Sequence, residues 1–196
     1  MSEVTRREAW RRINWLGLIA GALTLALPFW GPWWKFMLGT EAVTVFTSPF
    51  GVEMRFFGVE TISSPLFWWL CLGIKLCFVY LGALLLAGSV LAVSARYAAI
   101  GAQFVRFCAL KLLWFVAVFV AVLLVAIVLV NQLPGTLGLP FQLQLPYLIG
   151  RSTASAGLDG MRITIPVTMA FLQPFVIAVL AAATGISARV YHDKVL

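Results

Sequence analysis

The chain has 196 residues, of which 62% are hydrophobic and 11% are charged, and its formal net charge is +7. An average soluble domain is about 45–50% apolar and about 25% charged. So little charge cannot cover a compact body in water, which excludes an ordinary soluble globule and indicates an integral membrane protein. The basic balance is explained by membrane topology and anionic lipid, so we expect the lipid bilayer as a partner and no nucleic acid.

Four apolar segments are each long enough to cross a hydrocarbon core, which takes about 20 helical residues. They are residues 13–34, 66–95, 107–130 and 166–188. Ser63, Ser64 and Pro65 favour a helix start at the second segment, and Pro166 favours one at the fourth. The sequence therefore predicts an all-α membrane protein, a single four-span membrane domain over residues 1–196 with a bundle of four transmembrane helices.

Basic residues in short flanking segments mark the cytoplasmic side of a membrane protein. The N-terminus, the tight connection at 96–106 and the C-terminus carry eight Lys and Arg against three acids, whereas the outer loops at 35–64 and 131–165 carry four of each. This asymmetry predicts a multi-pass cell-membrane protein with both termini in the cytoplasm. Tryptophan prefers the membrane interface. We therefore interpret five tryptophans near the outer span ends as interface anchors: Trp30, Trp33, Trp34, Trp68 and Trp69.

The first outer loop contains two runs of β-prone residues, 43–47 and 52–57, around a Ser-Pro-Phe-Gly turn, which predicts a hairpin. In the second run, apolar side chains alternate with Glu53 and Arg55, so one face is apolar and the other polar. A lone hairpin is marginal in water, and residues 141–145 and 161–165 alternate in the same way. We predict a small extracellular antiparallel β-sheet of three or four strands from the two outer loops, with 150–157 as a mobile loop.

Residues that usually carry catalysis or bind metals are scarce. Cys71, Cys77 and Cys108 lie within the expected spans and match no redox or zinc spacing, so their expected role is that of small buried hydrophobes. The single histidine, His192, lies in the C-terminal tail, and no carboxylate lies in any span. We therefore predict a protein that is not an enzyme, with no catalytic residue, no metal and no cofactor.

Lys75 is the charge that lipid makes most costly, because helix rise places it roughly 15 Å past the start of the second span. Gln173 is expected at a similar depth in the fourth span, and Tyr80 follows Lys75 closely in the sequence. These three residues form the candidate ligand-binding site, suited to an anion, a lipid headgroup or a quinone carbonyl. The alternative is a lysine that snorkels, or that bonds to Tyr80, Gln173 or backbone carbonyls for packing alone.

Small residues recur at the spacing of one helix face. Gly17 and Gly21 form a GxxxG pair, and Ala83 and Ala87 repeat the spacing in the second span. Such pairs allow two helix backbones to approach closely. We expect them to pack the bundle internally, and self-association of copies is the alternative.

The run Ala26-Leu27-Pro28-Phe29-Trp30 is similar to the proline and tryptophan that end the first helix of claudins and peripheral-myelin-protein tetraspans. With four spans, cytoplasmic termini and a β-rich first outer loop, the chain resembles that family. The resemblance implies a helical bundle that carries an extracellular sheet. The family's Gly-Leu-Trp motif and paired loop cysteines are missing, so the resemblance does not extend to barrier or pore function.

Three functions follow as hypotheses. The leading one is a non-enzymatic tetraspan, a structural or accessory subunit that contacts other membrane subunits or copies of itself through its outer loops and helix faces. The alternative is a small oligomeric channel or transporter with Lys75 lining the pathway. The third is a quinone- or lipid-binding membrane subunit.

Overall fold

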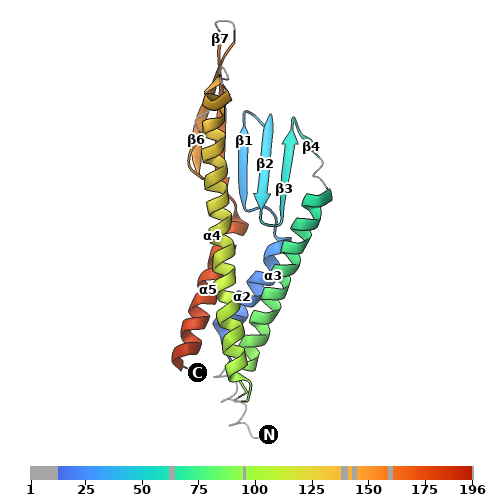
Figure 1. Ribbon diagram of the computed structural model, residues 1–196, viewed down its shortest axis with the longest axis vertical. Helices are drawn as coiled ribbons and strands as arrows, with labels where there is room; N and C mark the ends of the chain where they lie inside the picture. Colours follow the sequence, from blue (N-terminus) through green and yellow to red (C-terminus); the bar gives the residue numbers. More distant parts are fainter. Residues whose placement is uncertain are drawn as a thin grey trace. The chain divides into compact units, whose positions relative to one another are not determined.

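The computed structural model describes residues 13–61, 65–94, 96–137, 141–142, 145–158 and 161–195 (Figure 1). The chain is mostly helical and carries one antiparallel sheet. Its elements in chain order are α2 (Trp15–Ala26), η1 (Leu27–Phe29), β1 (Trp34–Leu38), β2 (Val43–Ser48), β3 (Gly51–Phe56), β4 (Val59–Thr61), α3 (Pro65–Leu91), α4 (Ala98–Leu137), β5 (Phe141–Gln142), β6 (Gly150–Leu158), β7 (Met161–Phe171) and α5 (Gln173–Val195).

These elements divide into two compact units. The helical unit lies within Met1–Gly31, Leu72–Ala117 and Val176–Leu196, and the sheet unit lies within Pro32–Cys71 and Val118–Phe175. The N-terminal arginines, Ser63, Ser64, Leu143 and Gln144, on which parts of the sequence predictions rest, fall outside the described residues.

Within the described residues, three helices are long and apolar enough to cross a membrane, which supports a membrane protein: Pro65–Leu91, Ala98–Thr136 and Gln173–Tyr191. The helical stretch Trp15–Phe29 is apolar but shorter. The 40 residues of α4 extend over about 60 Å, roughly twice the thickness of a hydrocarbon core. The C-terminal part of α4, from Val118 onwards, belongs to the sheet unit.

Several predicted boundaries are wrong. The first helical stretch ends at Phe29 instead of residue 34, because Gly31 turns the chain with a φ of 99° and Trp34 begins β1. The fourth helix begins at Gln173, since the residues from Pro166 onwards belong to β7. The connection expected at 96–106 is shorter, because α4 already begins at Ala98.

Pro166 lies inside β7 without breaking the sheet. It stands opposite Thr153 of β6 and one residue beyond Val167, where the pairing of β7 with β1 ends. Its carbonyl accepts a hydrogen bond at 2.7 Å from the N–H of Gly39, the residue that follows the end of β1. The Pro166 carbonyl therefore points away from β6. The N–H and C=O of a strand residue point to the same side, so the N–H that proline lacks removes nothing from the β6 ladder.

In the part of the chain that the structure describes, the sheet has seven strands in the order β4-β3-β2-β1-β7-β6-β5, all antiparallel. The predicted hairpin is confirmed as β2 and β3. The expectation of a mobile loop at 150–157 is wrong, because Gly150–Leu158 pairs along its whole length with β7. β1 and β4 were not predicted, and they enlarge the sheet beyond the three or four strands expected.

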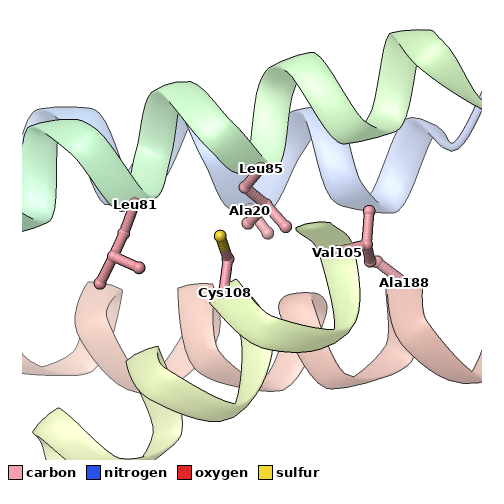
Figure 2. Close-up of a cluster of buried hydrophobic side chains, with 6 residues drawn as sticks. All are labelled: Ala20, Leu81, Leu85, Val105, Cys108 and Ala188. Carbon is pink, nitrogen blue, oxygen red and sulfur yellow. The ribbon is translucent and has the colours of Figure 1, made fainter. Parts of the chain in front are cut away.

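The helical unit packs around small side chains. The helices α2, α3, α4 and α5 each contribute to one buried cluster (Figure 2), which consists of Ala20, Leu81, Leu85, Val105, Cys108 and Ala188. Glycines bring the backbones together: a Cβ on Gly88 of α3 would lie 2.9 Å from the Gly101 carbonyl oxygen of α4. A Cβ on Gly21 of α2 would lie 3.1 Å from the carbonyl oxygen of Gly82 on α3. A methyl group at Gly88 would therefore collide with a backbone atom, and one at Gly21 would crowd the backbone of α3.

A buried asparagine fixes the start of α2. Asn14 Oδ1 accepts a hydrogen bond from the Gly17 N–H at 3.1 Å, and Asn14 Nδ2 donates to the Ala188 carbonyl of α5 at 2.9 Å. One side chain thus caps α2 and joins it to α5. Gly17 is buried against Ser89 of α3, so its lack of a side chain makes room for this contact.

Candidate functional site

The sheet unit is built around Trp33. Its buried ring makes edge-to-face contacts with Phe50, Phe119 and Phe175, at centroid distances of 5.6, 5.1 and 6.0 Å. Next to it, the buried Trp34 donates its indole N–H to the Leu148 carbonyl at 2.8 Å. The interpretation of Trp33 and Trp34 as interface anchors is therefore wrong, because the chain leaves the helix before them and folds both rings into the sheet unit.

The other three of the five predicted interface anchors are exposed. Trp30 follows η1, while Trp68 and Trp69 lie in the first turn of α3 and contact each other edge to face at 4.9 Å. Leu66 and Leu70 are exposed beside them. An exposed group of aromatic and aliphatic side chains at the start of a helix that can span a membrane is typical of the membrane interface.

One face of the sheet and the C-terminal part of α4 line an open apolar pocket of about 310 Å³. The sheet contributes alternate residues, as expected for one strand face. The sheet side is lined by Trp34, Phe36, Val45, Thr47, Val52, Met54 and Met169, the α4 side by Leu123, Ala126, Ile127 and Val130, and Leu145 completes the wall. The prediction that Val52 and Met54 share an apolar face is confirmed, and none of the described lining residues is charged.

Asn131 holds one wall of this pocket in place. Its Oδ1 accepts a hydrogen bond from the Leu145 N–H at 2.8 Å, and its Nδ2 donates to the Leu145 carbonyl at 3.2 Å. The amide thus pairs with the backbone much as a neighbouring strand would, and it holds Leu145 beside α4. The sequence analysis missed this role, although an asparagine directly after a long apolar run was its visible signal.

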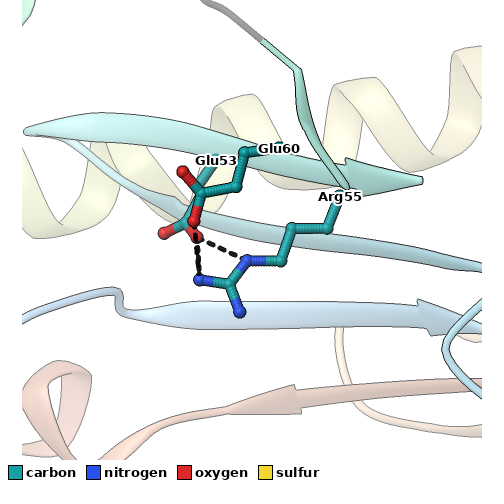
Figure 3. Close-up of polar contacts among 3 residues, drawn as sticks. All are labelled: Glu53, Arg55 and Glu60. Atoms are coloured by element: carbon teal, nitrogen blue, oxygen red, sulfur yellow. Dashed lines mark hydrogen bonds and ion pairs between the residues drawn. The ribbon is translucent and has the colours of Figure 1, made fainter. Parts of the chain in front are cut away.

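The opposite face of the sheet is polar (Figure 3). Arg55 Nε donates to Glu53 at 2.7 Å, and a terminal guanidinium nitrogen of Arg55 donates to Glu60 at 3.1 Å. Lys35 and Arg55 both lie over the Phe46 ring, 5.4 and 5.7 Å from its centroid. The side chains of the Arg55 cluster are largely accessible to water, where ion pairs contribute little stability.

The turn between β3 and β4 has an unusual composition. Phe57 and Gly58 have φ angles of 48° and 81°, so both lie in the left-handed region, as a type I′ hairpin turn requires. The usual first residue of such a turn is Asn or Asp, and a bulky residue there is strained. The Phe57 N–H donates to the Ala42 carbonyl at 2.9 Å, which fixes the turn. The Phe57 side chain is 84% exposed, and Val59 beyond it is 71% exposed.

The three residues expected to form a ligand site are not arranged as the sequence analysis assumed. Gln173 is the exposed first residue of α5 and does not lie partway through a span, because β7 occupies the residues before it. Lys75 is half-buried on α3, whereas Tyr80 is exposed. Residues five apart on a helix point about 140° away from each other, so Lys75 and Tyr80 face different directions. Lys75 belongs to the helical unit and Gln173 to the sheet unit.

Other candidate residues are distributed as follows. Ala83 and Ala87 are exposed on α3, so unlike Gly17 and Gly21 they do not pack inside the helical unit. Cys71 and Cys108 are buried, whereas Cys77 is exposed, contrary to expectation. Across the part of the chain that the structure describes, no three His, Cys, Asp or Glu side chains gather closely enough to hold a metal ion.

No family model, no curated protein and no solved structure matches this chain. The resemblance to claudin-like tetraspans thus gains no support from these comparisons.

Proposed function

We propose that this chain is a non-enzymatic membrane protein, a structural or accessory subunit that recruits a partner protein through the β3–β4 turn of its sheet. The observation that carries the proposal is Phe57, an aromatic side chain held in a left-handed backbone conformation and almost fully exposed.

A strained residue of this kind costs on the order of 1–3 kcal/mol and persists where the surrounding structure enforces it. Here the hydrogen bond from the Phe57 N–H to Ala42 and the pairing of Phe56 with Val59 enforce it. Neither feature gives the ring a place to pack. Exposed apolar groups that are contiguous mark interaction sites, and rigid aromatic side chains are frequent anchors of protein interfaces. Phe57, Phe56 and Val59 together meet that description.

We further propose that both termini are cytoplasmic and that the sheet lies outside the cell, which is the orientation that the basic flanks predict. In this orientation the partner is an extracellular protein, or the outer part of another protein in the same membrane. For a partner in the same membrane, the bilayer already restricts both proteins to two dimensions. Binding through a small apolar contact then loses less rotational and translational entropy.

The recruitment proposal is tested by changing Phe57 to Asn. Asparagine suits the left-handed position, so the variant should be as stable as the native protein or more stable by up to about 1 kcal/mol, whereas partner recovery should fall about tenfold. To identify the partner, a photoreactive phenylalanine analogue is placed at position 57 in living cells, where it should crosslink to one discrete protein. The recovery of that protein with the native chain is then compared with its recovery with Phe57→Asn.

The matched control is Tyr147, another aromatic residue of the sheet unit, which is 73% exposed. Tyr147→Asn should leave partner recovery unchanged, and the photoreactive analogue at 147 should not give the same adduct. Equal recovery from Phe57→Asn and the native protein, or adducts with lipid alone, would contradict the proposal.

The orientation is tested with single cysteines in a background that lacks Cys71, Cys77 and Cys108. A cysteine at Phe57 should react with a membrane-impermeant maleimide in intact cells, whereas one at Ser2 should react only after permeabilisation. The reverse pattern would place the sheet in the cytoplasm and would exclude an extracellular partner.

A further inference from the structure

We propose that the pocket between the sheet and α4 binds one hydrocarbon chain of a membrane lipid. The proposal does not depend on the Phe57 surface, because Phe57 is not among the residues that line the pocket.

The chemistry of the lining selects an apolar ligand. Its polar side chains are Thr47, with one hydroxyl group, and Trp34, whose indole N–H already donates to the Leu148 carbonyl. A water molecule in a site of this kind finds too few hydrogen-bonding partners to be held there. At about 310 Å³, the pocket has about twice the volume of the roughly 150 Å³ apolar cavity that binds benzene or xenon. It can therefore hold a substantial apolar group and gives a charged one no counter-charge.

The shape of the pocket favours a chain over a ring system. Its floor crosses four neighbouring strands, from Met169 on β7 through β1 and β2 to Met54 on β3. Neighbouring strands are about 4.8 Å apart, so this floor is about 14 Å long. A volume of about 310 Å³ distributed over that length leaves a cross-section about as wide as one hydrocarbon chain.

The pocket is open, and the bilayer is the source of such chains. Met54 at one end is 42% exposed, and Ala126 on α4 is exposed as well. The same compact unit contains the start of α3, where Leu66, Trp68 and Trp69 form the exposed apolar group described above. The unit that contains the pocket therefore also contains a segment suited to the membrane interface.

The test uses purified full-length protein in phospholipid vesicles that contain a phospholipid with a photoreactive group in its acyl chain. In the native protein, adducts should map to pocket residues such as Met54, Ile127 and Met169. Ala126→Phe places a ring in the pocket and should reduce these adducts about tenfold. Ala121→Phe makes the same change on an exposed residue of α4 outside the pocket lining and should leave them unchanged.

Several outcomes would overturn the proposal. If the native protein gives no adducts at the pocket residues, the chain site does not exist, and this result is independent of how either variant folds. Equal pocket labelling in Ala126→Phe and Ala121→Phe would also reject it. Thr47→Val removes the hydroxyl at constant shape, so it should preserve labelling, and loss of labelling would assign the site to a carbonyl-bearing headgroup instead.

The source of the chain is decided by competition. Unlabelled phospholipid and an isoprenoid quinone are each added at increasing amounts to the vesicles with the photoreactive probe. A hydrocarbon-chain site should be blocked by at least one of them, and the stronger competitor identifies the source. If neither the phospholipid nor the quinone reduces labelling of the pocket residues, the pocket is not a specific site, and the proposal is overturned.

Discussion

The helical unit and the sheet unit are stabilised by opposite means. The helical unit brings backbones into contact at Gly88 and Gly101, and its cluster around Ala20 and Cys108 is made of small and aliphatic side chains. The sheet unit is held by strand pairing and by large rings around Trp33. In lipid, apolar side chains gain nothing from leaving the solvent, so helices there depend on close backbone approach. In water, large rings contribute most because they remove the most apolar area.

The two units therefore differ in packing style although both contain long apolar stretches. The C-terminal part of α4 belongs to a helix apolar enough to span a membrane, yet its Phe119 packs against Trp33 within the sheet unit. Three substitutions test this comparison.

The largest effect is expected at the centre of the sheet unit. Trp33→Ala removes a ring that contacts three phenylalanines and should cost about 3–5 kcal/mol in the free energy of unfolding. Trp69→Ala, in the same unit but exposed, should cost less than about 0.5 kcal/mol. The measurement is reversible unfolding in detergent. Similar costs for the two variants would mean that the ring cluster does not hold the sheet unit.

A somewhat smaller effect is expected in the helical unit. Gly88→Ala introduces a methyl group 2.9 Å from a backbone oxygen that cannot move freely, and it should cost about 2–3 kcal/mol. Gly73, in the same helix, has open space around it, so Gly73→Ala should stabilise α3 by up to about 1 kcal/mol. Thermal unfolding in detergent measures both variants, and a stable Gly88→Ala protein would disprove close packing of α3 on α4.

The smallest effect is expected on the polar face of the sheet. Arg55→Gln removes the contacts to Glu53 and Glu60, which lie where water screens them, and should cost less than about 1 kcal/mol. The cost should shrink further in 1 M salt. A cost that is large and independent of salt would show that this face is buried against something.

The sequence predicted those features that depend on local pattern. The alternation around Glu53 and Arg55 correctly identified the β2–β3 hairpin and its two faces. β6 was missed because Ser, Thr, Ala and Gly give 150–157 the composition of a loop, and its order comes from pairing with β7. Trp33 was misassigned because the sequence around a tryptophan near the end of a span is the same whether its ring faces lipid or a protein core.

Little of the candidate site could be predicted, because it depends on contacts distant in the sequence. The pocket needs Met54 and Ile127 on opposite walls, and nothing in their local sequences links them. The predicted group of Lys75 and Gln173 relied on counting helix residues, which failed once β7 replaced the first turns of the expected fourth span. For Phe57, the following Gly58 was the only cue to a left-handed turn.

The two ends of the sheet bear on its tendency to pair with another chain. β4 has three residues and β5 has two, whereas their neighbours β3 and β6 have six and nine. An uncovered strand edge is a template on which another chain can add. β4 pairs only with Met54, Arg55 and Phe56 of β3, and β5 pairs only with Ser155 and Ala156 of β6. Each end of the sheet therefore offers an added chain a short and stepped edge, which limits pairing with a second copy.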